Sequence, residues 1–105
     1  MGNTVYMAYR IEFAKSVINQ IKALPAYQRP RLLKSIEEQL TYEPLQETRN
    51  RKPLRPNPLA PWELRIGELR VFYEVCEDEP DVVRILAVGQ KKGNRLIIAG
   101  KEIQL

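Results

Sequence analysis

The strongest structural signal in this sequence is the segment Trp62–Val75, whose middle reads Ile-Gly-Glu-Leu. Two central residues with glycine first favour a type II′ turn between antiparallel strands. That turn sets the register of the two strands, with Ile66 opposite Leu69 and Arg65 opposite Arg70. The segment therefore predicts a β-hairpin whose side chains can be assigned to two faces.

This register gives the hairpin one apolar face and one charged face. The apolar face, which we expect to pack against helices, consists of Trp62, Leu64, Ile66, Leu69, Val71, Tyr73 and Val75. Arg65 and Arg70 lie on the other face, beside Glu63, Phe72 and Glu74. Like charges directly opposite each other destabilise a sheet. Either the glutamates neutralise the arginines in a surface ion network, which spacing alone favours, or an anion binds there.

The segments on either side of the hairpin predict an α+β fold. Residues Val5–Phe13 alternate in polarity like a half-buried strand, and two segments of helical spacing follow. The first helix carries Val17, Ile18, Ile21 and Leu24 and ends at Pro25; the second has Pro30 in its first turn and carries Leu32, Leu33, Ile36 and Leu40. Val82–Val88 reads as a central strand, and short strands follow over 96–99 and 100–105. We expect one domain over residues 1–105: an N-terminal strand, an antiparallel two-helix hairpin, and a twisted antiparallel sheet of three or four strands.

Residues 41–61 form a proline-rich and basic segment. Five of the eight prolines fall there: Pro44, Pro53, Pro56, Pro58 and Pro61. The same segment holds the cations Arg49, Arg51, Lys52 and Arg55. Such proline density predicts neither helix nor strand but an ordered surface loop or an extended arm. A solvated connector and an arm that contacts phosphates fit this composition about equally well.

The composition excludes several classes of chemistry. The chain has no histidine, which removes the Ser-His-Asp triad, imidazole acid–base catalysis and most zinc sites. Cys76 is the single cysteine, so no internal disulfide forms and we expect a core residue. Seventeen Lys and Arg against thirteen Asp and Glu give a net charge of +4, which mildly favours a polyanionic partner. No apolar run approaches the ~20 residues that span a bilayer, and the N-terminus lacks signal-peptide features, so we expect a cytoplasmic protein without membrane contact.

Four stretches of the sequence resemble a known family. They are Tyr9–Phe13, Leu24-Pro25, Trp62–Val75 with the pattern W-x-L-R-x-G-x-x-R-V-x-Y-x-V, and Val88–Lys92. Together they are similar to the RelE/ParE family of bacterial toxins from type II toxin–antitoxin systems, and the likeness extends over nearly the whole chain. The resemblance implies a small α+β domain with a twisted antiparallel sheet, the RelE-like fold. It also implies ribosome-dependent mRNA cleavage for the RelE branch and poisoning of DNA gyrase for the ParE branch.

The resemblance also implies site residues. RelE-like enzymes use arginine and lysine, without a metal or cofactor, and on this chain the catalytic positions are Arg65, Arg70 and Lys91. The basic residues that we expect to contact RNA are Arg49, Arg51, Lys52, Arg55, Lys92 and Arg95. The C-terminal tyrosine of the family is replaced by the run Leu96-Ile97-Ile98, so we expect a modest cleavage rate.

The partners implied by the resemblance are a cognate antitoxin, the ribosome and mRNA. Toxin and antitoxin are expected to assemble as a heterotetramer. Two alternatives stay open at this point: a gyrase poison of the ParE type, and a family member that acts only by binding its antitoxin.

Overall fold

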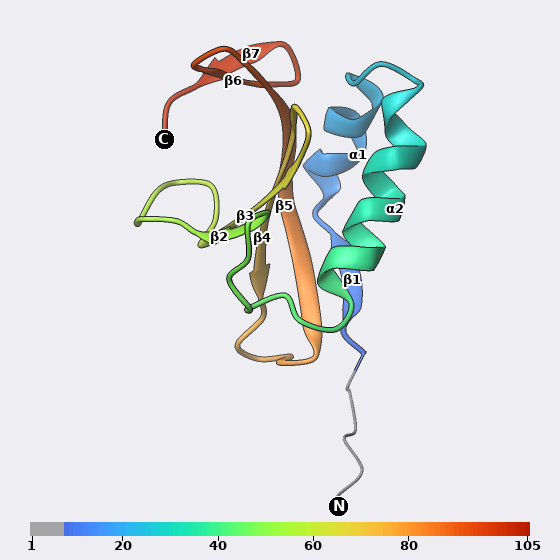
Figure 1. Ribbon diagram of the computed structural model, residues 1–105, viewed down its shortest axis with the longest axis vertical. Helices are drawn as coiled ribbons and strands as arrows, with labels where there is room; N and C mark the ends of the chain where they lie inside the picture. Colours follow the sequence, from blue (N-terminus) through green and yellow to red (C-terminus); the bar gives the residue numbers. More distant parts are fainter. Residues whose placement is uncertain (1–7) are drawn as a thin grey trace, which may run out of the picture.

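The computed structural model describes residues 8–105, in which two helices lie on one face of a β-sheet (Figure 1). The helices are α1 (Lys15–Lys22) and α2 (Gln28–Leu40). The strands are β1 (Arg10–Phe13), β2 (Arg51–Pro53), β3 (Trp62–Ile66), β4 (Leu69–Val75), β5 (Val82–Lys92), β6 (Arg95–Ile98) and β7 (Lys101–Ile103). This is the α+β architecture that the sequence predicts. No helix within residues 8–105 is long and apolar enough to cross a membrane.

The sheet is larger than predicted and one of its pairs is parallel. Within the described residues it has seven strands, in the order β2-β3-β4-β5-β6-β7, with β1 beside β5. β4 occupies one edge of β5, so β1 and β6 share the other edge, at opposite ends of β5. β1 runs parallel to β5, because the two helices carry the chain back before the hairpin strands begin. Residues 5–7 of the predicted first strand lie outside the described residues.

The hairpin β3–β4 forms with the predicted register. Ile66 pairs with Leu69 and Arg65 with Arg70. Gly67 has φ +57°, and Glu68 has no positive φ, which is the combination that a type II′ turn requires. The dipeptide at the turn therefore decides which residues face each other across the two strands.

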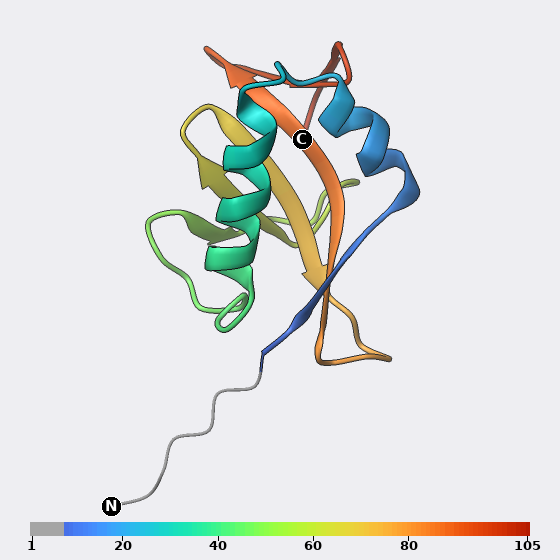
Figure 2. The ribbon, with the colours of Figure 1, turned by 90° about the vertical axis from the view of Figure 1, so that its right-hand side faces the viewer.

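The main core lies between the helices and the sheet. It includes the hairpin's predicted apolar face, and its helix-side members include Val17, Leu32, Ile36 and Leu40. The helices splay apart, so that α1 packs on β5 and α2 on β3 (Figure 2). Arg29 stabilises the corner between them, because its guanidinium donates to the carbonyls of Ile21, Lys22 and Leu24 at 3.2, 2.7 and 3.1 Å. The predicted helical hairpin is confirmed.

The opposite face of the sheet carries a second, smaller core. Its buried members are Ala60, Phe72, Ala87, Leu96 and Ile98, and Leu54, Leu59, Leu86 and Ile103 pack against them. The loop between β2 and β3 and the hairpin β6–β7 cover this face, on the side away from the helices in Figure 1. The expectation that Phe72 belongs to a charged outer face is therefore wrong. Two long-range covering segments, which no local pattern predicts, bury it completely.

The proline-rich segment also differs from its prediction. Arg51–Pro53 forms the edge strand β2, paired with β3, where no strand was expected. The proline is tolerated because it ends a short strand at the edge of the sheet. The rest of the segment is ordered loop, in which Asn57 accepts hydrogen bonds from the backbone amides of Leu59 and Ala60 at 2.8 and 3.1 Å.

Candidate functional site

Three of the predicted site residues meet on one face of the sheet, beside the β3–β4 turn. Arg65 and Arg70 are directly paired, and Arg70 is also opposite Gly89 of β5. Lys91 lies two residues beyond Gly89 and therefore projects to the same face. The backbone amide of Lys91 donates to the carbonyl of Glu68 at 2.7 Å, which brings β5 up to the turn. The register thus places Lys91 of β5 beside the two arginines of the hairpin, from which it is distant in sequence.

A glutamate holds the first of these cations in place. Arg65 Nε lies 2.7 Å from Glu63 Oε1, and the Glu63 side chain is only 10% exposed, whereas that of Arg65 is 50% exposed. A buried carboxylate needs such a partner. The ion pair therefore orients Arg65 while leaving much of its guanidinium accessible. The sequence left two alternatives for this face: glutamates that neutralise the arginines, or a bound anion. In this geometry both can hold, because Glu63 pairs with Arg65 and the guanidinium still has accessible surface for an anion.

Arg70 is held by its own turn. Its Nη1 donates to the carbonyls of Gly67 and Leu69 at 2.7 and 2.9 Å. Burial lowers the pKa of Arg70; the Glu63 carboxylate acts in the opposite direction, and neighbouring Arg65 lowers the pKa further. An arginine remains protonated at neutral pH despite such effects. Arg70 therefore places a partly desolvated positive charge at the centre of the cluster.

A fourth cation reaches the same turn from the helix side. A Cβ built on Gly67 would lie 2.9 Å from Nη2 of Arg31, so the Arg31 guanidinium rests directly on the glycine. Arg31 belongs to α2, and it was not among the residues predicted for the site. Helical spacing places it on an exposed position like many others. Only the packing of α2 beside the turn reveals the contact.

The turn between β5 and β6 extends the cationic surface. Lys92 and Arg95 are paired at this turn and both are exposed. Arg95 lies 3.5 Å from Glu102 of β7. A hollow of about 260 Å³ next to this pair is lined by Lys91, Asn94, Arg95, Leu96, Glu102, Ile103, Gln104 and Leu105. Arg95 therefore adjoins Lys91 at this hollow, whereas Lys92, the next residue of β5, projects to the opposite face of the sheet.

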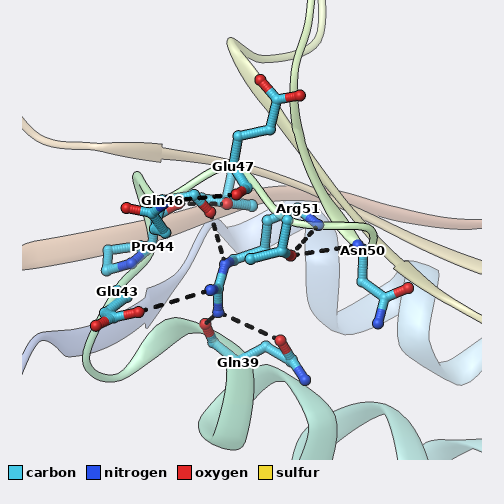
Figure 3. Close-up of polar contacts among 9 residues, drawn as sticks. Gln39, Glu43, Pro44, Gln46, Glu47, Asn50 and Arg51 are labelled. Carbon is cyan, nitrogen blue, oxygen red and sulfur yellow. Dashed lines mark hydrogen bonds and ion pairs between the residues drawn. The ribbon is translucent and has the colours of Figure 1, made fainter.

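The structure corrects the prediction that Arg51 contacts RNA. Only 8% of this residue is exposed, and its guanidinium is bound inside the protein (Figure 3). Nε donates to the carbonyl of Gln46 at 2.9 Å, Nη1 donates to the carbonyl of Gln39 at 2.7 Å, and Nη2 lies 4.0 Å from Glu43. With these internal partners, Arg51 ties the loop after α2 to the end of that helix. Its buried guanidinium therefore faces partners inside the protein rather than an external phosphate.

The other cations of the proline-rich segment remain accessible. Lys52 pairs with Glu63 across the β2–β3 ladder, so its side chain lies on the face of Arg65, and its Nζ is 3.9 Å from Glu47. Arg49 and Arg55 are exposed. Arg55 lines a hollow of about 420 Å³ between the proline-rich loop and the sheet. These three residues stay in the candidate site as predictions.

In the described part of the chain, no tyrosine follows Lys91 and no metal-ligand cluster accompanies these cations. Leu96 pairs with Lys91 between β6 and β5, and both Leu96 and Ile98 are buried in the second core, so β6 places apolar side chains and no hydroxyl beside Lys91. Tyr73 lies in the main core, where its hydroxyl donates to the carbonyl of Pro44 at 2.6 Å. Residues 8–105 contain no group of three or more acidic or cysteine side chains arranged to hold a metal. Chemistry at this face would depend on guanidinium and ammonium groups.

The sequence matches one family model. Residues 11–95 match the family described as ParE toxin of the type II toxin–antitoxin system parDE. No curated protein matches the chain. The matched range includes the four cations that meet at the hairpin turn.

Solved toxin structures have a similar fold. The toxin–antitoxin complex RelBE2 from Mycobacterium tuberculosis has a chain 24% identical, with a TM-score of 0.69; the match covers 85% of this chain and 98% of that one. The RelE–RelB complex from Pyrococcus horikoshii gives 27% identity, a TM-score of 0.63, and coverage of 84% and 99%. The isolated RelE toxin of E. coli gives 24% identity, a TM-score of 0.61, and coverage of 81% and 86%.

Proposed function

Since the chain belongs to the RelE/ParE superfamily of toxins from type II toxin–antitoxin systems, we propose that it inhibits translation by cleaving mRNA on the ribosome. The observation that carries this proposal is the convergence of Arg65, Arg70 and Lys91 on one face beside the hairpin turn. Three cations on one spot fit a single scissile phosphate better than they fit a protein surface. The likeness to RelE toxins supports the same choice.

The chemistry needs no metal or cofactor. The 2′-hydroxyl of the substrate releases its proton to solvent water, its oxygen attacks the adjacent phosphorus, and the bond to the 5′-oxygen of the next nucleotide breaks. Arg65 and Arg70 bind the phosphate and stabilise the additional negative charge of the pentacoordinate transition state. Lys91 donates a proton to the departing 5′-oxygen. The products are a 2′,3′-cyclic phosphate and a 5′-hydroxyl end.

The remaining cations have simpler roles in this proposal. Five of them contact phosphates on either side of the scissile one: Lys92, Arg95, Lys52, Arg49 and Arg55. These contacts raise the affinity for RNA without selecting a base sequence. Arg51 is left out of this set because its donors are used inside the protein. The ribosome would supply what the chain lacks, namely a surface on which the bases of the mRNA are held in place.

The partner that restrains this activity is a cognate antitoxin. Two of the similar solved structures are toxin–antitoxin complexes, which supports such a partner for this chain. We propose that toxin and antitoxin assemble as a heterotetramer. The exposed apolar residues on or next to the helices, Phe13, Ile18, Tyr27 and Leu33, offer apolar surface for that contact.

A second candidate function is inhibition of DNA gyrase. The observation that favours it is the family model, which is described for ParE toxins. A cationic face would then contact the DNA of a gyrase–DNA complex. A third candidate, binding of antitoxin without catalysis, is favoured by the absence of a tyrosine among residues 96–98.

Induced expression followed by mapping of mRNA ends distinguishes these functions. We expect cuts at fixed positions within codons, and a loss of at least about 100-fold in cleavage for Lys91→Ala, because a positioned general acid contributes about that much. Lys101→Ala is the matched control, since Lys101 is an exposed lysine on β7. Intact mRNA together with trapped gyrase–DNA breaks would replace the proposal with the second candidate. Intact mRNA and intact DNA, with antitoxin binding retained, would leave the third.

A further inference from the structure

Arg31 is a cation of α2 at the β3–β4 turn that the proposed function does not use. Its guanidinium lies against Gly67 at the β3–β4 turn, and the side chain is exposed. Among the described residues it makes no ion pair and no hydrogen bond. Glu68, the acidic residue of the same turn, is not within ion-pair distance. Arg31 thus keeps its donors free while being positioned by contact with the turn.

The helix itself offers Arg31 no counter-charge. Side chains three and four residues apart are neighbours on a helix. At those spacings from Arg31 stand Tyr27, Gln28, Lys34 and Ser35, none of which is acidic. Lys34 adds a further positive charge, although it lies 3.9 Å from Glu38. This face of α2 therefore carries an uncompensated charge next to the cationic cluster of the turn.

Glycine is the residue that permits this contact. The positive φ of Gly67 already favours glycine, and the absence of a side chain lets the guanidinium approach the turn backbone closely. Arg70 donates to the carbonyl of the same glycine from the other side of the hairpin. Two guanidinium groups thus contact one residue, from opposite faces of the sheet. Each guanidinium group can form charge-assisted hydrogen bonds with a separate anionic oxygen on its own side of the turn.

We propose that Arg31 binds a backbone phosphate of the RNA whose neighbouring phosphate is held by Arg65, Arg70 and Lys91. The RNA strand then crosses the β3–β4 turn, passing from the open face of the sheet to the side of α2. This inference rests on the proposed function, because it assigns a second phosphate contact to the same substrate. It adds a helix residue to a site that otherwise consists of strand residues.

The test is the binding of a single-stranded RNA oligonucleotide, with 2′-O-methyl groups to prevent cleavage, measured by fluorescence anisotropy over a series of salt concentrations. We expect Arg31→Gln to weaken binding about fivefold, as for one exposed ionic contact. The slope of log K against log salt should fall by about 0.7, the value for one phosphate contact to a single strand. Arg31→Lys should retain the slope.

Two further variants make the result decisive. Arg10→Gln is the negative control, because Arg10 is an exposed arginine of β1 paired with Glu79. Lys91→Gln is the positive control for the proposed active site. If Lys91→Gln weakens binding and Arg31→Gln behaves like Arg10→Gln, the Arg31 contact is wrong and the proposed function stands. If the wild-type protein does not bind RNA, or if Lys91→Gln also behaves like Arg10→Gln, the Arg31 contact is wrong, and the mapping of mRNA ends decides the proposed function separately.

Discussion

The sequence predicts that Arg51 binds RNA, whereas the structure gives it a role in stabilising the fold. In the sequence it is one of several cations in a basic segment, but its guanidinium is enclosed by the end of α2 and the following loop. We expect Arg51→Met to lower the free energy of unfolding by about 2–3 kcal/mol, because the carbonyls of Gln39 and Gln46 lose their charged donor. Urea denaturation measures the change.

The neighbouring lysine provides the control for that prediction. Lys52 is partly exposed, and its ammonium is 3.9 Å from Glu47. Lys52→Met should change the free energy of unfolding by less than about 0.5 kcal/mol, as is usual for surface ion pairs. Equal effects of the two substitutions would contradict the structural role given to Arg51.

Tyr73 predicts how stability depends on alkaline pH. Burial raises the pKa of Tyr73 above its ordinary value of 10.0, and nearby Arg51 opposes this effect. The folded state therefore favours the neutral phenol. Its contribution to stability is complete below about pH 10 and decreases as the pH rises further, because the unfolded chain then releases the proton more readily.

Urea denaturation at about pH 8 and about pH 10.5 measures this dependence. We expect the wild-type protein to lose more stability between these conditions than Tyr73→Phe does. The phenylalanine variant should also lose about 1 kcal/mol at pH 8, since the carbonyl of Pro44 loses its hydrogen bond. Parallel pH dependences of the two proteins would show that another group is responsible.

At the scale of an element, Gly89 decides whether the last hairpin can pair with β5. A Cβ at this position would overlap the carbonyl oxygen of Ile97 and lie 2.7 Å from Ile98 Cγ1. We expect Gly89→Ala to destabilise the protein by about 2–3 kcal/mol through this overlap. Hydrogen exchange should show the largest loss of protection in β6 and β7.

Gly93 is the matched control for Gly89. It has φ +61°, but a Cβ at this position would have no atom within 4 Å. Gly93→Ala should therefore cost only the backbone strain, about 1 kcal/mol. If both variants lose the same stability, the close approach of β6 to β5 is not the reason for glycine at position 89.

At the scale of the whole molecule, most of the exposed large apolar side chains lie on or next to the helices. The cationic cluster surrounds the hairpin turn, whereas large apolar side chains are exposed on or next to the helices, with Tyr27 78% and Ile18 55% exposed. We expect the antitoxin to bind mainly through apolar contacts, so that the complex persists in about 1 M salt, where charge interactions are screened. Size-exclusion chromatography with light scattering at low and high salt measures this, and a mass of two toxins and two antitoxins is expected. Complete dissociation in high salt would contradict the apolar account.

Local rules were sufficient for the elements with a strong pattern. The turn Ile66–Leu69, the helical spacings of α1 and α2, and the prolines at their ends predicted the hairpin, the register and the two helices, because each depends on neighbouring residues alone. The motif around the hairpin also indicated the toxin superfamily, which the family model confirms.

Contacts between distant segments decided the rest. Residues far apart in the chain meet in the parallel pairing of β1 with β5, in the cover over Phe72 and in the contact of Arg31 with Gly67. Arg51 is enclosed by the end of α2 and the loop that follows it. The amino-acid type alone does not specify which of the many arginines and lysines will be buried and which will come together at a turn. That choice follows from how the helices and the covering loops pack on the sheet, where burial of apolar surface outweighs the local preference of any single residue.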